Sequence, residues 1–228
     1  MIPFLTHTGL VSGLGIVFDL DGVIVDSNPV HTVSWREYLR RQGMEPPEGF
    51  EQRMYGRHND DIVRDLFGPG IDADETARHG AQKEALYREM MRPVLREHLV
   101  PGVVSFLERH KNVPMAIATN GERANADLVL EGGAVRQYFR AVVDGGMVSR
   151  PKPDPEIYLR TARLLGLPPA DCIVFEDSLA GAEAARAAGT RVVGLSTTHT
   201  SIPCARLTIQ DFLDAELEPW LSSQKAAG

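Results

Sequence analysis

Cysteine is scarce in this chain, which has only Cys172 and Cys204 among its 228 residues. The two residues do not form a C-x-x-C pair, so the sequence predicts neither a disulfide framework nor a thiolate zinc site. Scarce cysteine is typical of a reducing compartment, and we therefore expect this protein in the cytoplasm.

Long apolar runs and an excess of positive charge are also missing. No stretch of about 18 apolar residues occurs, so no membrane span is predicted. Residues 1–14 lack Lys and Arg and are interrupted by Pro3, Gly9 and Gly13, so we expect no signal peptide. The formal net charge of -7, from 24 basic and 31 acidic residues, disfavours nucleic acid or a membrane as a partner. The expected partner is a small diffusible molecule, and the expected state is a monomer or weak dimer.

Apolar residues gather in four short runs that predict strands buried on both faces. The composition is ordinary for a globular protein, with 43% hydrophobic and 24% charged residues. The predicted strands are Gly15–Leu20, Met115–Thr119, Cys172–Glu176 and Arg191–Leu195. Amphipathic segments predict helices at Val103–His110, Arg123–Leu130, Pro155–Leu165 and Leu179–Ala188, the last capped by Ser178. This alternation predicts a doubly wound, Rossmann-like α/β core made of residues 14–26 and 98–228, preceded by an N-terminal extension, 1–13.

The interval between the first two predicted strands is far longer than a crossover needs. A crossover takes about a dozen residues. Residues 27–97 show no strand pattern and three helical patterns, at Pro29–Gln42, Asn59–Phe67 and Asp74–Met91. We therefore predict a small α-helical cap domain, residues 27–97, inserted after the first strand, with hinges near Val25–Ser27 and Glu97–Gly102.

Two carboxylates, Asp19 and Asp21, stand two residues apart at the end of the first predicted strand. Ligands of open α/β sheets bind at the carboxyl ends of the strands, which makes this pair a candidate site. A calcium-binding loop is the alternative explanation. Such a loop needs further oxygen ligands and a later glycine, whereas Gly22 is followed directly by three apolar residues.

Three other segments carry polar groups at the same edge of the predicted sheet. Taken singly, each has an ordinary explanation, as a helix cap or as a solvated lysine. Together they predict one shared site. The residues are Thr119, Asn120, Gly121, Lys152, Glu176 and Asp177.

The order of the segments DLDGV, ATNG, KPDP and FEDS resembles the haloacid dehalogenase-like superfamily of phosphohydrolases over nearly the whole chain. Within that superfamily, a helical insert directly after the first motif, with Asp26, Ser27, His31 and Trp35, resembles the β-phosphoglucomutase-like branch. That branch also contains many sugar-phosphate phosphatases.

The resemblance implies catalysis through a phosphoryl group carried on Asp19. Asp19 is expected to be the nucleophile and Asp21 the general acid and base. An acyl phosphate formed in this way can be cleaved by water, which splits one difficult step into two. Thr119 and Lys152 are expected to stabilise the transferring oxygens.

The resemblance also implies a Mg²⁺ ion. Its expected ligands are carboxylate oxygens of Asp19 and Asp177 and the backbone carbonyl of Asp21, with Glu176 acting through water. Oxygen ligands with retained waters suit Mg²⁺. The ion is needed because the carboxylates and a phosphate dianion would otherwise repel each other.

The predicted cap is expected to close over this site and to select the substrate, as in the branch that the chain resembles. The expected substrate contacts are His31, Arg57 and Lys83 from the cap and Asn120 and Gly121 from the core. His199, in a polar cluster after the last predicted strand, is given no role.

Two activities remain open at this point, hydrolysis and isomerisation. β-Phosphoglucomutases hold a second phosphate with a cap arginine and a small hydroxyl residue, where this chain aligns Asn59 and Gly121, although Arg57 or Arg123 could substitute. We expect a Mg²⁺-dependent phosphatase acting on a small phosphomonoester, a sugar phosphate, with a phosphosugar mutase as the alternative. Asp21 and the four intact motifs disfavour a carbon–halogen-cleaving enzyme and a non-catalytic protein.

Overall fold

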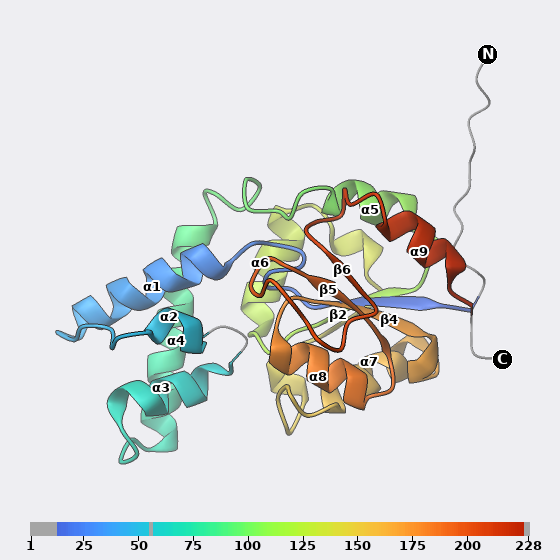
Figure 1. The fold of residues 1–228 in the computed structure, drawn as a ribbon. Coiled ribbons are helices and arrows are strands. Elements are labelled where there is room, and N and C mark those ends of the chain that lie inside the picture. Colours follow the sequence, from blue (N-terminus) through green and yellow to red (C-terminus); the bar gives the residue numbers. More distant parts are fainter. Residues whose placement is uncertain (1–12, 55–56, 226–228) are drawn as a thin grey trace.

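The centre of the protein is a parallel sheet. The computed structural model describes residues 13–54 and 57–225 (Figure 1). Within these residues, six strands pair in the order β3-β2-β1-β4-β5-β6. They are β1 (Gly15–Phe18), β2 (Met115–Ala118), β3 (Ala141–Val143), β4 (Cys172–Glu176), β5 (Arg191–Leu195) and β6 (Leu207–Ile209). The predicted Rossmann-like α/β class is therefore confirmed, and the four predicted strands are present; β3 and β6 were not predicted.

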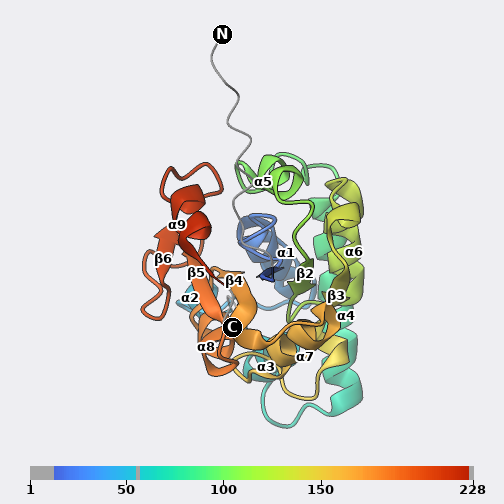
Figure 2. The same cartoon turned by 90° about the vertical axis from the view of Figure 1, so that its right-hand side faces the viewer.

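Helices cover both faces of the sheet, as Figure 2 shows. Side chains of a strand alternate between faces, so Ile16 and Phe18 join one apolar cluster and Val17 joins the other. The first cluster includes residues of α5 (Val103–Arg109), α6 (Arg123–Gly132) and α9 (Leu217–Ser223). The second includes residues of α7 (Glu156–Leu165) and α8 (Leu179–Ala187). As predicted, Ser178 caps α8, accepting a hydrogen bond from the backbone N–H of Gly181.

The order of the strands reverses between β1 and β4. The chain runs outward from β1 to β2 and β3, then returns past the sheet to β4 and runs outward again to β5 and β6. Ligands of such sheets bind at this switch point, beyond the carboxyl ends of the strands. The parallel register pairs Phe18 with Phe175, so the residues that follow, Asp19 and Glu176, emerge side by side.

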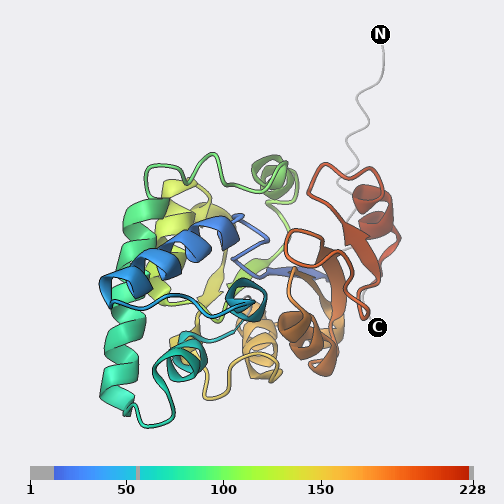
Figure 3. The same ribbon diagram turned by 60° about the vertical axis from the view of Figure 1, so that its left-hand side comes forward.

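Among the described residues, four helices lie between β1 and α5, beyond one end of the sheet (Figures 1 and 3). They are α1 (Asn28–Arg41), α2 (Phe50–Met54), α3 (Asn59–Phe67) and α4 (Ala73–Met91). We call them the helical insert; α2 was not predicted. Trp35, Tyr38 and Leu86 belong to an apolar cluster of the insert, whereas Tyr87 and Met91 join the cluster of the sheet. Helix α4 therefore contributes to both clusters.

The two connections between the insert and the sheet run next to each other. The backbone N–H of Asp26 donates to the carbonyl of His98 at 2.8 Å, and Val100 donates to Ile24 at 3.1 Å. These segments coincide with the predicted hinges, while the extent of a separate cap domain stays a prediction. The predicted N-terminal extension lies outside the described residues, except for Gly13. No helix in the described part of the chain is long and apolar enough to span a membrane.

Candidate active site

Asp19 stands at the carboxyl end of β1, buried at the switch point of the sheet. Its backbone N–H donates to the carbonyl of Phe175 at 3.0 Å, which continues the pairing of β1 with β4. Beyond it the chain turns sharply: the carbonyl of Leu20 accepts N–H groups from residues 23, 24 and 25. The turn passes through Gly22 with φ of 72° and brings Asp21 to the same side as Asp19.

Lys152 connects two of the predicted carboxylates. Its ammonium nitrogen lies 2.6 Å from Oδ1 of Asp19 and 2.6 Å from Oε1 of Glu176. Its backbone N–H donates to Oδ1 of Asn120 at 3.0 Å. Because Lys152 is itself buried, this arrangement is a desolvated charge-assisted contact rather than a surface ion pair.

Glu176 is fully hydrogen-bonded. Besides the ammonium group of Lys152, Oε1 accepts from the hydroxyl of Tyr158 at 2.7 Å. Oε2 accepts from the backbone N–H of Asp177, from that of Ser178 and from the Ser178 hydroxyl, each at 3.0 Å. A carboxylate has about four lone-pair sites, so five donors leave little capacity for an ion. Glu176 thus orients Lys152 and the start of α8.

Asp177 lies against the turn at Gly22. A Cβ on Gly22 would come within 1.9 Å of Oδ2 of Asp177, so only glycine fits beside this carboxylate. The hydroxyl of Thr198 donates to Asp177, and the amide of Asn28 donates to Thr198 at 2.6 Å. Thr197 donates to the carbonyl of Gly22 at 2.6 Å. The loop after β5, which includes His199, therefore holds both the turn and Asp177.

The carboxylate cluster of Asp19, Glu176 and Asp177 carries more negative charge than its surroundings balance. Ligand oxygens of the three residues lie within 4.8 Å of one another. Burial raises the pKa of Asp19 to about 7 despite the opposing effect of Lys152. Burial, with the nearby charges of Glu176 and Asp19, also raises the pKa of Asp177 well above its ordinary value. A hard cation held by carboxylate oxygens would relieve this repulsion, so the donor set fits Mg²⁺.

Asp21 has a different environment. Its Oδ1 accepts a hydrogen bond from the hydroxyl of Ser27 at 2.6 Å and lies 3.5 Å from Nε2 of His31. Burial alone would raise the pKa of Asp21, but the contacts with His31 and Ser27 lower it overall. The other oxygen, Oδ2, faces Gly121, where a Cβ would lie 3.6 Å away. Asp21 is thus held by the insert side and presents Oδ2 to the loop after β2.

Residues of the insert continue this network. The ammonium of Lys83 lies 2.8 Å from Nδ1 of His31 and 2.6 Å from Oε1 of Glu84. An ammonium group can only donate, so the neutral His31 ring carries its proton on Nε2, toward Asp21. The ring also stacks on Tyr87, with centroids 3.8 Å apart. Lys83 is buried and has its own carboxylate partner, Glu84.

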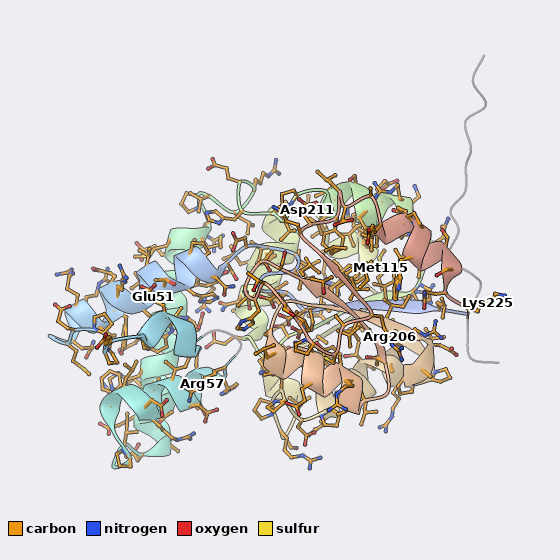
Figure 4. The ribbon with its side chains drawn as sticks, viewed as in Figure 1. Glu51, Arg57, Met115, Arg206, Asp211 and Lys225 are labelled. Atoms are coloured by element: carbon orange, nitrogen blue, oxygen red, sulfur yellow. The ribbon has the colours of Figure 1, made fainter. Side chains whose placement is uncertain are left out.

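A cavity of about 270 Å³ lies between the sheet and the insert. Ten of the predicted site residues line it, and only Glu176 lies behind the lining. The ten are Asp19, Asp21, His31, Arg57, Lys83, Thr119, Asn120, Gly121, Lys152 and Asp177. Figure 4 shows Arg57 on the insert side of the molecule, far from Met115 at the start of β2. The structure thus brings the predicted residues together, while their roles stay predictions.

Several contacting residues were not given a role from the sequence. Tyr158, Thr198 and Ser27 hydrogen-bond to Glu176, Asp177 and Asp21. Glu84 and Glu122 also line the cavity. The polar run after the last predicted strand was a usable signal for Thr198, because it stands at the same edge as the other motifs. Nothing in the local sequence distinguishes Tyr158 from an ordinary helix residue.

Comparison with known proteins gives concordant matches. A family model described as a haloacid dehalogenase-like hydrolase matches residues 14–189. The chain is 34% identical over 180 residues to the fructose-1-phosphate phosphatase YqaB of Escherichia coli, covering 78% of this chain and 94% of that protein. It is 29% identical over 210 residues to a beta-phosphoglucomutase of Bacillus subtilis, covering 89% and 92% of the two proteins.

A crystal structure of a beta-phosphoglucomutase from Clostridium difficile has the same fold. Its TM-score is 0.81 at 24% identity, over 92% of this chain and 97% of that one. The fold, the site and these matches define a phosphohydrolase. The chain belongs to the haloacid dehalogenase-like hydrolase family, in its β-phosphoglucomutase-like branch, and the resemblance indicated by the motifs is confirmed.

Proposed function

We propose that this enzyme is a Mg²⁺-dependent phosphatase that hydrolyses a small phosphomonoester, a sugar phosphate, through an aspartyl-phosphate on Asp19. One observation carries the proposal. Asp19 lies beside an ammonium group at the switch point of the sheet, and Asp21, held separately by Ser27, lines the same cavity. Two carboxylates in one cavity suit a nucleophile and a proton-transfer group, and a bound cation would lower the raised pKa of Asp19 so that it is ionised for attack.

The proposed reaction has two steps. Asp21 first takes up a proton as the substrate binds, because its pKa is lowered and it is ionised in the free enzyme. A carboxylate oxygen of Asp19 then attacks phosphorus, the ester P–O bond breaks, and Asp21 gives this proton to the leaving alkoxide. Water then attacks the phosphorus of the acyl phosphate while Asp21 takes up a proton. Inorganic phosphate leaves and the Asp19 carboxylate is restored.

Asp19 and Asp177 would hold Mg²⁺ through carboxylate oxygens and Asp21 through its backbone carbonyl. Glu176, expected from the resemblance to act through water, already accepts five hydrogen bonds and would act instead by orienting Lys152. When bound, the ion would neutralise charge on the transferring phosphoryl group. The crowding of carboxylates around Asp19 supports this assignment, since one lysine cannot balance three of them.

Groups of the protein would contact the other phosphoryl oxygens. Lys152 supplies a fixed positive charge, and the Thr119 hydroxyl, which accepts from the N–H of Gly121 at 3.0 Å, can donate its own proton. Nδ2 of Asn120 is buried and has no acceptor among the described residues. A buried donor without a partner is costly, and a phosphate oxygen would satisfy it. His31, Arg57 and Lys83 would contact the substrate from the insert or act through Asp21.

A phosphosugar mutase is the second candidate, because the Bacillus subtilis relative that covers 89% of this chain is named as one. A mutase must return the phosphoryl group to a bisphosphate intermediate instead of passing it to water. Both activities use the same phosphorylated Asp19, so they differ in products rather than in the nucleophile.

The test is phosphate release from a panel of sugar phosphates and other small monoesters, with Mg²⁺ or with EDTA. We expect EDTA and Asp19→Asn each to lower kcat by roughly a thousandfold or more. Asp74→Asn, which removes the same charge on the exposed surface of the insert, is the matched control. Undiminished release in EDTA or from Asp19→Asn would refute the proposal. Faster conversion of β-glucose 1-phosphate to glucose 6-phosphate than release of phosphate would identify a mutase.

A further inference from the structure

The charges around the cavity are unevenly distributed. Its described lining contains six carboxylates, Asp19, Asp21, Asp60, Glu84, Glu122 and Asp177, and three lysine or arginine side chains, Arg57, Lys83 and Lys152. Each of these three cations already has a carboxylate partner. Lys152 contacts Asp19 and Glu176, Lys83 contacts Glu84, and Arg57 contacts Asp65 at 2.7 Å.

The lining histidines do not change this balance. His31 lies between Asp21 and Lys83, and Nδ1 of His58 accepts the N–H of Asp60 at the start of α3. Among the described lining residues, therefore, no unpaired cation is left for a second anionic group on the substrate. The proposed metal ion would balance the negative charge of the transferred phosphate only.

Glu122 adds a negative charge to the lining of the cavity. It directly precedes α6 and lines the cavity. Its Oε2 accepts from the guanidinium of Arg88 at 2.9 Å, but Arg88 is not part of the described lining. A ligand in the cavity therefore meets the carboxylate before the guanidinium. Glu122 is the N-cap residue of α6, but its carboxylate makes no hydrogen bond to the first turn and pairs with Arg88 instead.

Arg88 is itself fixed between the insert and the core. Its guanidinium also donates to Oδ1 of Asn125 at 2.8 Å, and Nδ2 of Asn125 donates to Oε2 of Glu84 at 2.6 Å. These contacts keep Arg88 directed toward α6. Glu122 thus covers a cation that would otherwise be available to the cavity.

We propose that the substrate, beyond its single transferred phosphate, is an uncharged group rich in hydroxyls, and that Glu122 is the specificity-determining residue that excludes a second phosphate or a carboxylate. This inference rests on the proposed phosphatase activity. Carboxylates such as Asp60 and Glu122 accept hydrogen bonds from hydroxyl groups and repel anions. A cavity of about 270 Å³ suits a small polyol.

The test compares compounds that differ in one additional anionic group. Suitable pairs are fructose 1-phosphate with fructose 1,6-bisphosphate, and glycerol 3-phosphate with 3-phosphoglycerate. For each compound we would measure kcat/KM for phosphate release. We would also measure its inhibition constant against p-nitrophenyl phosphate hydrolysis, so that the affinity of slowly hydrolysed compounds is known. For each pair we expect the wild-type enzyme to have a kcat/KM at least about tenfold higher, or an inhibition constant at least about tenfold lower, for the compound without the extra anionic group. This ratio is the preference.

Two substitutions should move this preference in opposite directions. Glu122→Gln keeps the size of the side chain but removes its negative charge, which leaves the charge of Arg88 uncompensated, so the preference should fall by about tenfold. Arg88→Gln leaves Glu122 unpaired, so the preference should rise. Glu131→Gln, an exposed position on the same helix outside the cavity lining, should leave the ratio unchanged.

The outcomes separate this inference from the proposed function. Equal use of both members of each pair by the wild-type enzyme, or a ratio that Glu122→Gln does not move, would overturn the inference while leaving the phosphatase intact. Failure to release phosphate from p-nitrophenyl phosphate and from every monoester in Mg²⁺ would instead refute the phosphatase.

Discussion

Two buried carboxylates of this protein each lie 2.6 Å from a lysine, Asp19 beside Lys152 and Glu84 beside Lys83. Their pKa values shift in opposite directions. Burial raises the pKa of Asp19 to about 7, and the nearby charge of Glu176 adds to the rise. Burial would also raise the pKa of Glu84, but Lys83 and other close partners lower it to about 2.

The difference lies in how many partners each carboxylate has. Lys152 is shared between Asp19 and Glu176, so the core site keeps a surplus of negative charge. Glu84 has Lys83 and also accepts from the amides of Asn59 and Asn125, each at 2.6 Å. A saturated buried pair mainly fixes structure, whereas an unbalanced one is prepared for a ligand. The core site is thus suited to chemistry with a cation, and the Glu84 site joins the insert to the core.

The strongest way to test this contrast is to remove each lysine. Lys83→Met should lower the free energy of unfolding by about 3–5 kcal/mol, because the buried Glu84 carboxylate would keep its amide donors but lose its counter-charge. Lys152→Met should also destabilise the protein, but Mg²⁺ should restore part of the loss by binding the carboxylate cluster. Urea unfolding of both variants, in EDTA and in Mg²⁺, measures this. If Mg²⁺ stabilised both variants equally, or stabilised neither of them, the proposed difference between the Asp19 and Glu84 sites would be wrong.

A second comparison uses glycine in the core and in the insert. A Cβ at Gly181 would lie 1.7 Å from Oε1 of Glu176, whereas one at Gly80 in α4 would have Asn59 as its nearest neighbour, at 3.8 Å. Gly181→Ala should therefore cost about 1–3 kcal/mol and lower kcat by displacing Glu176 and Lys152. Gly80→Ala should stabilise α4 by about 0.5–1 kcal/mol. Thermal unfolding measures the stability of both variants, and phosphate release measures their activity. If Gly181→Ala and Gly80→Ala were equally stable, the proposed difference between the two positions would be wrong.

The third test is a pH dependence from Glu84. Its pKa in the folded protein, about 2, lies below the ordinary value of 4.5. The resulting stability is therefore fully present above about pH 4.5 and is lost as the pH falls toward 2. The stability gap between the wild type and Glu84→Gln should narrow by about 1 kcal/mol between pH 6 and pH 4 in EDTA. A gap that stays constant or widens would mean that Glu84 is not held ionised by its partners.

The sequence was sufficient for the central strands and insufficient for the edges of the sheet. β1, β2 and β4 are buried along their whole length and therefore appear as continuous apolar runs. β3 and β6 have three residues each and include partly exposed positions, so they give no such run. The short helix α2 was missed because five residues give too few turns for a clear period, and α9 was missed because Pro219 interrupts its seven residues.

The residues of the candidate site also fall into two groups, those that could be predicted from the sequence and those that could not. Residues at the ends of predicted strands, such as Asp19 and Thr119, could be placed at one edge because parallel strands end together. Contacts made from elsewhere could not be predicted in this way. Tyr158 reaches Glu176 from a position 18 residues earlier, and Thr198 reaches Asp177 from 21 residues later, through the packing of the sheet.

The neighbouring ends of the helical insert bear on how such enzymes can diversify. Asp26 and His98 are hydrogen-bonded to each other, so the chain leaves the sheet and rejoins it at almost one point. Lengthening, shortening or replacing the segment between them need not move either end, and loop length itself carries only a small entropic cost. Selection can therefore alter the segment proposed to contact the substrate while Asp19, the proposed nucleophile, and its strand stay in place.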